Sequence, residues 1–173
     1  PTGLGKPFYE FQKYIKMIFE RGVILAINSK NNYEDAIDII HNHPYMILRE
    51  ENFADMEINW NDKAQNLRNI SKKLNLGLDS IVFVDDDKLN CEIVKNSLPE
   101  VEVVNLPEDP SLYVSTFMNM VHMFDVLYLT EEDKNKGSMY VQNRKRQELK
   151  SEFTDIDEYL KNLDMNVKIE EDS

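Results

Sequence analysis

Hydrophobic residues recur at two different spacings along this chain, and the two spacings alternate. Residues 7–21 place apolar side chains at helical spacing, and residues 23–27 follow as a short apolar run typical of a buried strand. The same reasoning predicts further helices over 33–42, 63–74, 88–97, 110–124 and 131–150, and further strands over 45–48, 56–58, 80–84 and 101–104. Strands that alternate with helices predict an α/β fold with a mostly parallel sheet flanked by helices.

The last part of the chain has a different pattern. Residues 151–163 show one more amphipathic helical pattern, residues 165–169 resemble the start of a strand, and residues 170–173 have the composition of a loose acidic end. We therefore expect one α/β domain over residues 1–150. A helical C-terminal part over residues 151–173 is expected to form a linker towards a possible second domain.

Composition and charge narrow the class of protein. Hydrophobic residues make up 42% and charged residues 30% of the 173 residues, as in soluble globular proteins. The formal net charge of −12 argues against nucleic-acid binding and against docking to anionic membranes, because both need a basic surface. A single cysteine, Cys91, excludes an internal disulfide and is compatible with a reducing compartment. We therefore expect a cytoplasmic protein with no nucleic-acid or membrane partner.

The strongest chemical signal is the strand expected over residues 80–84, which runs into three consecutive acids, Asp85, Asp86 and Asp87. Apolar strand residues favour burial, whereas adjacent carboxylates repel one another and favour water or a cation. Ligands of open α/β sheets bind at the carboxyl ends of the strands. The pattern therefore predicts a carboxylate cluster that faces a binding crevice and suits Mg²⁺, a cation that prefers oxygen ligands.

A hydroxyl group and a lysine occupy comparable positions. Ser29 follows the strand expected over residues 23–27, where a helix start also offers N–H groups to an anion, and Lys63 opens a predicted helix. With Asp85 and Asp86 they provide a hydroxyl donor, a cation and an acid pair, a set that suits a phosphoryl group. Each residue alone has an ordinary structural explanation, Ser29 as a helix cap and Lys63 as a solvated residue. Their combined order along the chain favours a binding site.

This order of hydroxyl, lysine and acid pair resembles motifs two to four of the haloacid dehalogenase superfamily, and more closely its FkbH-like subfamily. The resemblance extends over residues 4–169 and is carried by the segments 22–31, 43–49, 59–63, 76–86 and 131–144. It implies a phosphatase-type, Rossmann-like fold with a Mg²⁺ site. Some members of the subfamily load a glyceryl unit, taken from a phosphorylated glycerate, onto a carrier protein in polyketide or related biosynthesis.

The resemblance implies a role for each candidate residue. Ser29 would hydrogen-bond a phosphoryl oxygen, and Lys63 would neutralise the nucleophile and the phosphoryl group. Asp85 and Asp86 would hold Mg²⁺ directly or through water. The implied substrate contacts are Asn31 and Asn59. The implied partners are a phosphorylated small-molecule substrate and an acyl carrier protein, and the end of the chain resembles the approach to an acetyltransferase-like domain.

The chain departs from the family in one respect. The first motif of the superfamily, Asp-x-Asp-x-Thr, supplies the nucleophile, the general acid and metal ligands, and the sequence does not contain it. The strand that carries this motif is expected at the centre of the sheet, between the strands that bear Ser29 and Asp85. The chain is then either a fragment without its catalytic strand or a degenerate copy. We expect it to be inactive by the family mechanism and to bind Mg²⁺ weakly, because a ligand is missing.

Two other functions are compatible with parts of this pattern. The missing motif favours a non-catalytic scaffold or assembly module in which the acid cluster is vestigial. A signalling receiver domain also combines a doubly wound sheet with an acid pair. In a receiver domain, however, the acid pair precedes the hydroxyl residue and the lysine, and the order here is the reverse.

Overall fold

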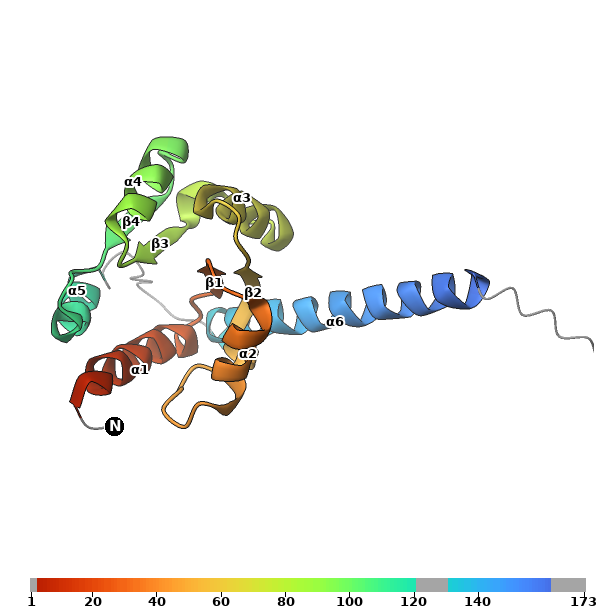
Figure 1. The fold of residues 1–173 in the computed structure, drawn as a ribbon, viewed down its shortest axis with the longest axis horizontal. Coiled ribbons are helices and arrows are strands. Elements are labelled where there is room, and N and C mark those ends of the chain that lie inside the picture. Colours follow the sequence, from red (N-terminus) through yellow and green to blue (C-terminus); the bar gives the residue numbers. More distant parts are fainter. Residues whose placement is uncertain (1–2, 121–130, 163–173) are drawn as a thin grey trace, which may run out of the picture.

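The structure is a computed structural model that describes residues 3–120 and 131–162. Its main elements in chain order are α1 (Lys6–Glu20), β1 (Leu25–Ser29), α2 (Tyr33–Asn42), β2 (Phe53–Ile58), α3 (Lys63–Leu74), β3 (Val82–Asp85), α4 (Lys88–Ser97), β4 (Glu102–Asn105), α5 (Tyr113–Met120) and α6 (Glu131–Asn162). Short 3₁₀ turns lie before α1, β2, β3 and α5. Helices alternate with parallel strands and flank them, which confirms the predicted α/β class (Figure 1).

Aspartate caps determine where the two helices beside the strand ends begin. Asp62 accepts a hydrogen bond from Ala64 N (3.0 Å) at the start of α3. Asp87 accepts hydrogen bonds from Leu89 N (2.7 Å) and Asn90 N (3.2 Å) at the start of α4. Each carboxylate satisfies backbone N–H groups that the first helical turn leaves without an intrahelical partner. The predicted bounds of both helices agree with the structure.

The strand predicted over residues 45–48 is wrong, because this segment forms a turn and a bend. The side chain of Gln12 in α1 explains the difference. Its Oε1 accepts hydrogen bonds from Ile47 N (2.8 Å) and Leu48 N (3.3 Å). A side chain from a distant helix therefore takes the hydrogen bonds that a neighbouring strand would have supplied.

The two helical patterns predicted after residue 130 form one continuous helix, α6, because no proline or glycine separates them. Arg144 anchors this helix by donating from Nη2 to the backbone oxygen of Glu50 (3.3 Å). Beyond this anchor α6 extends away from the rest of the molecule (Figure 1). Neither α6 nor any other helix of the described residues has both the length and the apolar character needed to cross a membrane.

Three predictions concern residues that the structure does not describe or a boundary that it does not test. The helix predicted over 110–124 begins as a 3₁₀ turn (Pro110–Leu112) and continues as α5 up to Met120, and its last residues lie outside the described part. The strand predicted over 165–169 also lies outside the described residues. The domain boundary at residue 150 stays a prediction.

The strands form two separate pairs rather than one continuous sheet. β1 pairs in parallel with β2, from Leu25 opposite Phe53 to Ser29 opposite Ile58, and β3 pairs in parallel with β4. In the described part of the chain, β1 and β3 line a common cavity without pairing. The parallel arrangement is as predicted, but the sheet is divided at the position expected for the missing strand, and its neighbours have not closed up.

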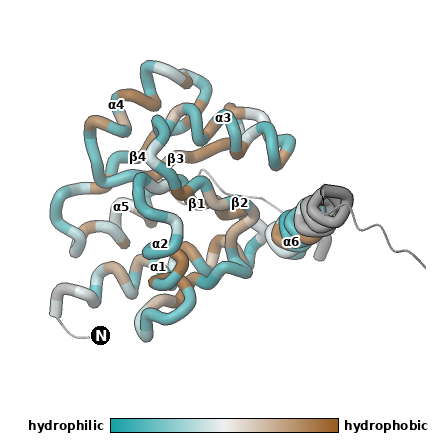
Figure 2. The backbone as a smooth tube through the Cα atoms, turned by 45° about the vertical axis from the view of Figure 1, so that its right-hand side comes forward, coloured by the Kyte–Doolittle hydropathy of each residue, from teal (hydrophilic) through white to brown (hydrophobic). Residues whose placement is uncertain are grey.

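Two buried clusters cover the two faces of the strands. Helices α3 and α4 pack on one face through residues such as Leu67, Val94 and Phe83 of β3. Helices α1 and α5 pack on the other face through Ile18 and Phe117. Figure 2 shows hydrophobic stretches along the strands at the centre of the molecule. Burial on both faces explains why β1 and β3 each begin as a continuous apolar run in the sequence.

Lys73 connects α3 to β2 through ion pairs, and these ion pairs make the stability of the fold depend on pH in the alkaline range. Its Nζ lies 3.2 Å from Asp55 Oδ1 and 2.7 Å from Glu57 Oε1. Burial alone would lower the pKa of Lys73, but the two carboxylates outweigh burial and raise the pKa above its usual value. Protonated Lys73 therefore stabilises the fold fully at pH values below the pKa that the residue has in the unfolded chain. This contribution is lost as the pH rises through the higher pKa that Lys73 has in the folded chain.

We expect Lys73→Met to abolish this alkaline loss of stability, measured as the free energy of unfolding in urea across the alkaline range. Lys72→Met, which removes an exposed lysine of the same helix, should leave the loss in place. Identical pH profiles for the two variants would contradict the proposed origin of the effect.

Candidate functional site

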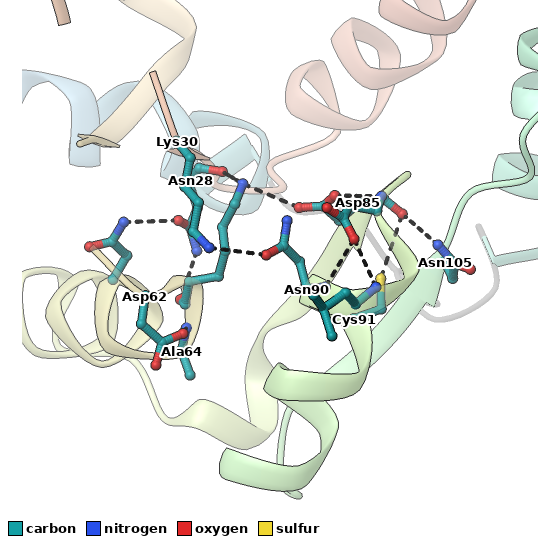
Figure 3. A network of polar contacts seen from close by, with 12 residues as sticks. Asn28, Lys30, Asp62, Ala64, Asp85, Asn90, Cys91 and Asn105 are labelled. Carbon is teal, nitrogen blue, oxygen red and sulfur yellow. Dashed lines mark hydrogen bonds and ion pairs between the residues drawn. The ribbon is translucent and has the colours of Figure 1, made fainter. Parts of the chain in front are cut away.

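The carboxyl ends of β1 and β3 and the start of α3 meet at one place. Lys63, the first residue of α3, donates from Nζ to the backbone oxygen of Asn28 (2.5 Å) and lies 3.2 Å from Asp85 Oδ2. Asn28 belongs to β1 and Asp85 ends β3, so one ammonium group bridges the two strand pairs. Figure 3 shows Asn28 and Asp85 on the two sides of this bridge. The structure thus brings together two of the candidate residues predicted from the sequence.

The ion pair between Lys63 and Asp85 is nearly buried. Each of the two side chains is only 9% exposed to solvent. A charge at this depth is costly without a partner, so each group requires the other. The ring of Phe83 adds an aromatic face, with its centroid 6.0 Å from Lys63 Nζ. The ammonium is therefore held by a carboxylate, a backbone oxygen and an aromatic ring, with little access to water.

Three asparagines hold the polar end of β1 against α3. Asn66, which is fully buried in α3, donates from Nδ2 to Asn28 Oδ1 (3.1 Å) and to Asn59 Oδ1 (3.0 Å). Asn28 Nδ2 in turn donates to the backbone oxygen of Lys63 (2.9 Å). The network thus pairs the side-chain oxygens of Asn28 and Asn59 with the amide group of Asn66, whereas Asn66 Oδ1 is buried without a hydrogen-bond partner among the described residues. It also fixes the backbone of Lys63 relative to β1.

Asn66→Ala is expected to lower the free energy of unfolding by about 1–3 kcal/mol, because the partly buried oxygens of Asn28 and Asn59 lose a donor. Urea denaturation followed by circular dichroism measures this change. Gln65→Ala, at an exposed position of the same helix, should change stability by less than about 0.5 kcal/mol. Equal effects of the two substitutions would show that the network does not hold α3 in place.

The predicted metal-binding acids differ in their surroundings. Asp85 Oδ1 accepts a hydrogen bond from Asp87 N (2.8 Å), and Asp85 Oδ2 faces Lys63. Asp86 is exposed, and the hydroxyl group of Tyr113 lies 3.5 Å from its Oδ2. Burial raises the pKa of Tyr113, and the nearby carboxylate of Asp86 raises it further, so the hydroxyl stays protonated as a donor. Asp86 therefore has more contact with water than Asp85.

The available donor set fits a weak Mg²⁺ site. Mg²⁺ is commonly bound through one or two carboxylates, while water and substrate phosphate fill its other positions. Asp85 and Asp86 supply two such carboxylates at the end of β3. The described residues contain no cluster of three or more metal-ligating side chains, and Lys63 competes with a metal ion for Asp85. The residues therefore suit a Mg²⁺ ion whose remaining ligands come from elsewhere.

Ser29 is the last residue of β1 and lies at the same strand end. Its backbone oxygen accepts a hydrogen bond from Asn59 N (3.0 Å), which extends the pairing of β1 with β2. The cap residue of α2 is Asn32, so the alternative that Ser29 caps this helix is wrong. The first turn of α2 carries Glu34 and Asp35, whose negative charges oppose an anion there. The start of α2 is therefore a poorer anion site than the sequence pattern suggested.

The two predicted substrate contacts already bind groups of the protein. Asn31 Oδ1 accepts a hydrogen bond from Asn32 N (2.8 Å) in the turn after β1. Asn59 Oδ1 accepts from Asn66, and Asn59 Nδ2 donates to Glu57 Oε2 (2.9 Å). Both side chains therefore stabilise the loops around the site, and their contact with a substrate stays a prediction.

Sequence reasoning missed several polar residues of this region. Asn28 supplies the backbone oxygen that accepts a hydrogen bond from Lys63. In the sequence, the only feature that points to Asn28 is its position as an amide residue at the end of an apolar run. At the rim, Lys30 Nζ donates to Asn90 Oδ1 (3.3 Å) and connects the turn after β1 with α4 (Figure 3). Trp60, in the loop between β2 and α3, is 69% exposed, so its fluorescence can report the binding of a ligand near these strand ends.

Comparisons with known proteins identify one relevant structure. No family model matches the chain, and no curated protein matches it. A crystal structure of the N-terminal part of the protein BF1531 from Bacteroides fragilis, which contains a phosphatase domain complexed with Mg, is similar with 38% sequence identity and a TM-score of 0.70. The match covers 74% of this chain and 34% of that chain, so this chain spans about a third of its length. The chain therefore shares the α/β fold of a protein part that contains a phosphatase domain and was crystallised with Mg.

Proposed function

We propose that this chain forms the phosphoryl-binding part of a Mg²⁺-dependent, phosphatase-type site with a haloacid-dehalogenase-like fold. The observation that carries the proposal is the position of Lys63, whose ammonium lies between the carboxyl ends of β1 and β3 beside Asp85. Phosphoryl groups are bound chiefly by positioning and charge neutralisation, and this arrangement supplies a fixed cation at a ligand-binding edge.

Each residue has a defined task in this proposal. Lys63 neutralises charge on the phosphoryl group, and the hydroxyl group of Ser29 donates a hydrogen bond to one of its oxygens. Asp85 and Asp86 hold Mg²⁺, which when bound neutralises further negative charge on the phosphate. Asp87 keeps α4 in place as its cap, so that the backbone after β3 stays fixed.

The substrate in this proposal is a phosphorylated small molecule. The resemblance to the FkbH-like subfamily supports a more specific version, in which a protein that contains this domain transfers a glyceryl-type unit to an acyl carrier protein. The sequence lacks the Asp-x-Asp-x-Thr nucleophile motif. We therefore propose that the 173-residue chain binds phosphate without hydrolysing phosphate esters on its own.

A non-catalytic assembly module is the second candidate. The observation that favours it is the internal pairing of Lys63, which already has a carboxylate and a backbone oxygen as partners. Under this alternative the chain binds neither Mg²⁺ nor phosphate at this strand end.

Titration of Mg²⁺ in the presence and absence of orthovanadate, followed by calorimetry and by the fluorescence of Trp60, separates the two candidates. We expect saturable binding in the millimolar range that Asp85→Asn weakens by at least about tenfold, because one of two carboxylate ligands is lost. Asp79→Asn removes the same charge from an exposed turn before β3 and should bind as the unaltered chain does. Circular dichroism verifies that each variant is folded. Absence of saturable binding in the unaltered chain would overturn the proposal in favour of the assembly module.

A further inference from the structure

A groove runs between α6 and the body of the fold. Helix α6 packs on β2, and Figure 1 shows the first part of α6 next to this strand. The groove is lined by β2, the end of α3, the turn that follows α3, and α6. Its volume of about 660 Å³ lies within the usual range for small-molecule sites. We call it the α6 groove and define it by Asp55, Leu74, Leu76, Tyr140 and Arg144.

Two buried polar atoms of residues in the α6 groove have no hydrogen-bond partner. Among the described residues, three buried side-chain atoms lack a partner, and they are Asp55 Oδ2, Arg144 Nε and Asn66 Oδ1. Asp55 and Arg144 both line the α6 groove, and their side chains are only 10% and 9% exposed. Buried polar atoms in folded proteins nearly always have a partner, because an unmade hydrogen bond is costly. The groove therefore combines one acceptor and one donor that a bound molecule can satisfy.

Both residues already have charged partners. Asp55 Oδ1 lies 3.2 Å from Lys73 Nζ. Arg144 Nη1 lies 3.4 Å from Glu50 Oε1 and 3.1 Å from Glu148 Oε1. A further charge in the groove would have to leave water without a partner of its own, which is unfavourable. A neutral ligand that donates to Asp55 and accepts from Arg144 avoids this cost.

Apolar side chains form much of the remaining lining. Leu74 belongs to the main buried cluster, and Leu76 and Tyr140 pack against it. These side chains lie on both sides of the groove, since Leu74 and Leu76 come from the end of α3 and the turn after it, whereas Tyr140 comes from α6. Aliphatic and aromatic surfaces of this kind favour a flat ring system that carries its polar atoms along one edge.

We propose that the α6 groove binds a purine nucleoside through a lactam edge, in which an N–H group lies next to a carbonyl oxygen, as in inosine and guanosine. The N–H group donates to Asp55 Oδ2, and the carbonyl oxygen accepts from Arg144 Nε. Arginine is the side chain that most often binds this carbonyl edge of guanine, and an ionised carboxylate only accepts hydrogen bonds. The exposed amide side chains that also line the groove are suited to the ribose hydroxyl groups, and they belong to Asn75, Asn143 and Gln147.

A small movement gives the base access to the two buried atoms. Neighbouring atoms cover both of them in the described structure. Met139 and Gln147 line the groove and are exposed, and exposed side chains change rotamer within nanoseconds. The nucleoside therefore enters by displacing exposed side chains of α6, while the backbone of β2 stays in place.

A nucleoside in this position connects α6 with β2. Asp55 belongs to β2, and Arg144 belongs to the part of α6 that is anchored on Glu50. A ligand that binds only the folded chain raises its stability by mass action. We therefore expect inosine to raise the midpoint of thermal unfolding and to slow hydrogen exchange in the part of α6 around Arg144.

Calorimetric titration of inosine into the unaltered chain tests the proposal, and saturable binding is expected. Two matched nucleosides test the lactam edge. The compound 1-methylinosine lacks the N–H donor, and adenosine has an amino group in place of the carbonyl oxygen. Each should bind at least about tenfold more weakly than inosine, because one buried atom of the groove is again left without a partner.

Two variants assign the contacts. In Asp55→Leu, inosine and 1-methylinosine should bind equally, while Lys73 keeps Glu57 as its partner at 2.7 Å. Arg144→Lys keeps the positive charge beside Glu50 but removes the Nε donor, and it should bind inosine about tenfold more weakly. Asp79→Leu, which removes an exposed acid outside the groove, should bind all three nucleosides as the unaltered chain does. Circular dichroism verifies that each variant is folded.

Three outcomes overturn the proposal. The first is the absence of saturable inosine binding, which would leave the two buried atoms to water. The second is equal binding of inosine and adenosine by the unaltered chain. The third is an unchanged preference for inosine over 1-methylinosine in Asp55→Leu, which would place the nucleoside elsewhere.

Inosine carries no phosphate, so its binding does not depend on the proposed function. Asp85→Asn alters the strand-end site and should bind inosine as the unaltered chain does. Loss of inosine binding in this variant would place the nucleoside at the strand ends and overturn the assignment to the α6 groove. Retained inosine binding together with a failed Mg²⁺ titration supports the α6 groove and overturns the proposed function alone.

Discussion

Replacement of Phe117 by alanine is expected to lower the free energy of unfolding by about 3–5 kcal/mol, the usual cost of deleting a buried aromatic side chain. The side chain of Phe117 is 0% exposed. Its ring centroid lies 5.9 Å from that of Phe11 and 6.1 Å from that of Tyr14. The substitution removes these contacts between α5 and α1 and leaves a cavity that the surrounding side chains fill only in part.

The adjacent residue of α5 provides the control. Met118 is 47% exposed, and Met118→Ala is expected to change stability by less than about 0.5 kcal/mol. Urea unfolding of both variants, followed by circular dichroism, measures the difference. If the two substitutions cost the same, α5 does not pack on α1 through Phe117.

Replacement of Asp85 by alanine is expected to cost about 3 kcal/mol of folding free energy, because it leaves the charge of Lys63 buried without its partner. Both side chains are 9% exposed, so solvent does little to screen the unpaired ammonium. The backbone oxygen of Asn28 still accepts a hydrogen bond from Lys63, which keeps the cost at the lower end of the range for buried pairs.

Two further variants test this explanation. Asp86→Ala removes a neighbouring acid that is exposed and should change stability by less than about 0.5 kcal/mol. The double substitution Lys63→Met with Asp85→Leu should recover much of the loss, because no buried charge is left unpaired. A double variant that is less stable than Asp85→Ala would argue that packing, rather than charge, explains the cost.

The helices could be predicted where their signals are local. Asp62 and Asp87 each bind N–H groups two or three residues later, so the sequence around each helix start contains its own cap. The strand expected over residues 45–48 failed for the opposite reason. The oxygen that binds Ile47 N belongs to Gln12, 35 residues earlier, and such a contact has no local signature.

The candidate site shows the same division between local and distant signals. The meeting of Lys63 with Asp85 follows from topology, because the carboxyl ends of parallel strands gather at one edge. The hydrogen bond from Lys63 to Asn28 could not be predicted, since every residue has a backbone oxygen. This oxygen accepts from a side chain because no described strand pairs with that edge of β1.

The long helix α6 has a mechanical consequence. At ~1.5 Å per residue, its 32 residues span roughly 48 Å, and the part beyond Arg144 spans roughly 27 Å. A tilt of about 5° at the contact between Arg144 and Glu50 then displaces the far end by roughly 2 Å. The helix is a lever that converts a small rotation of its anchor into a displacement that a pair of spectroscopic labels can measure.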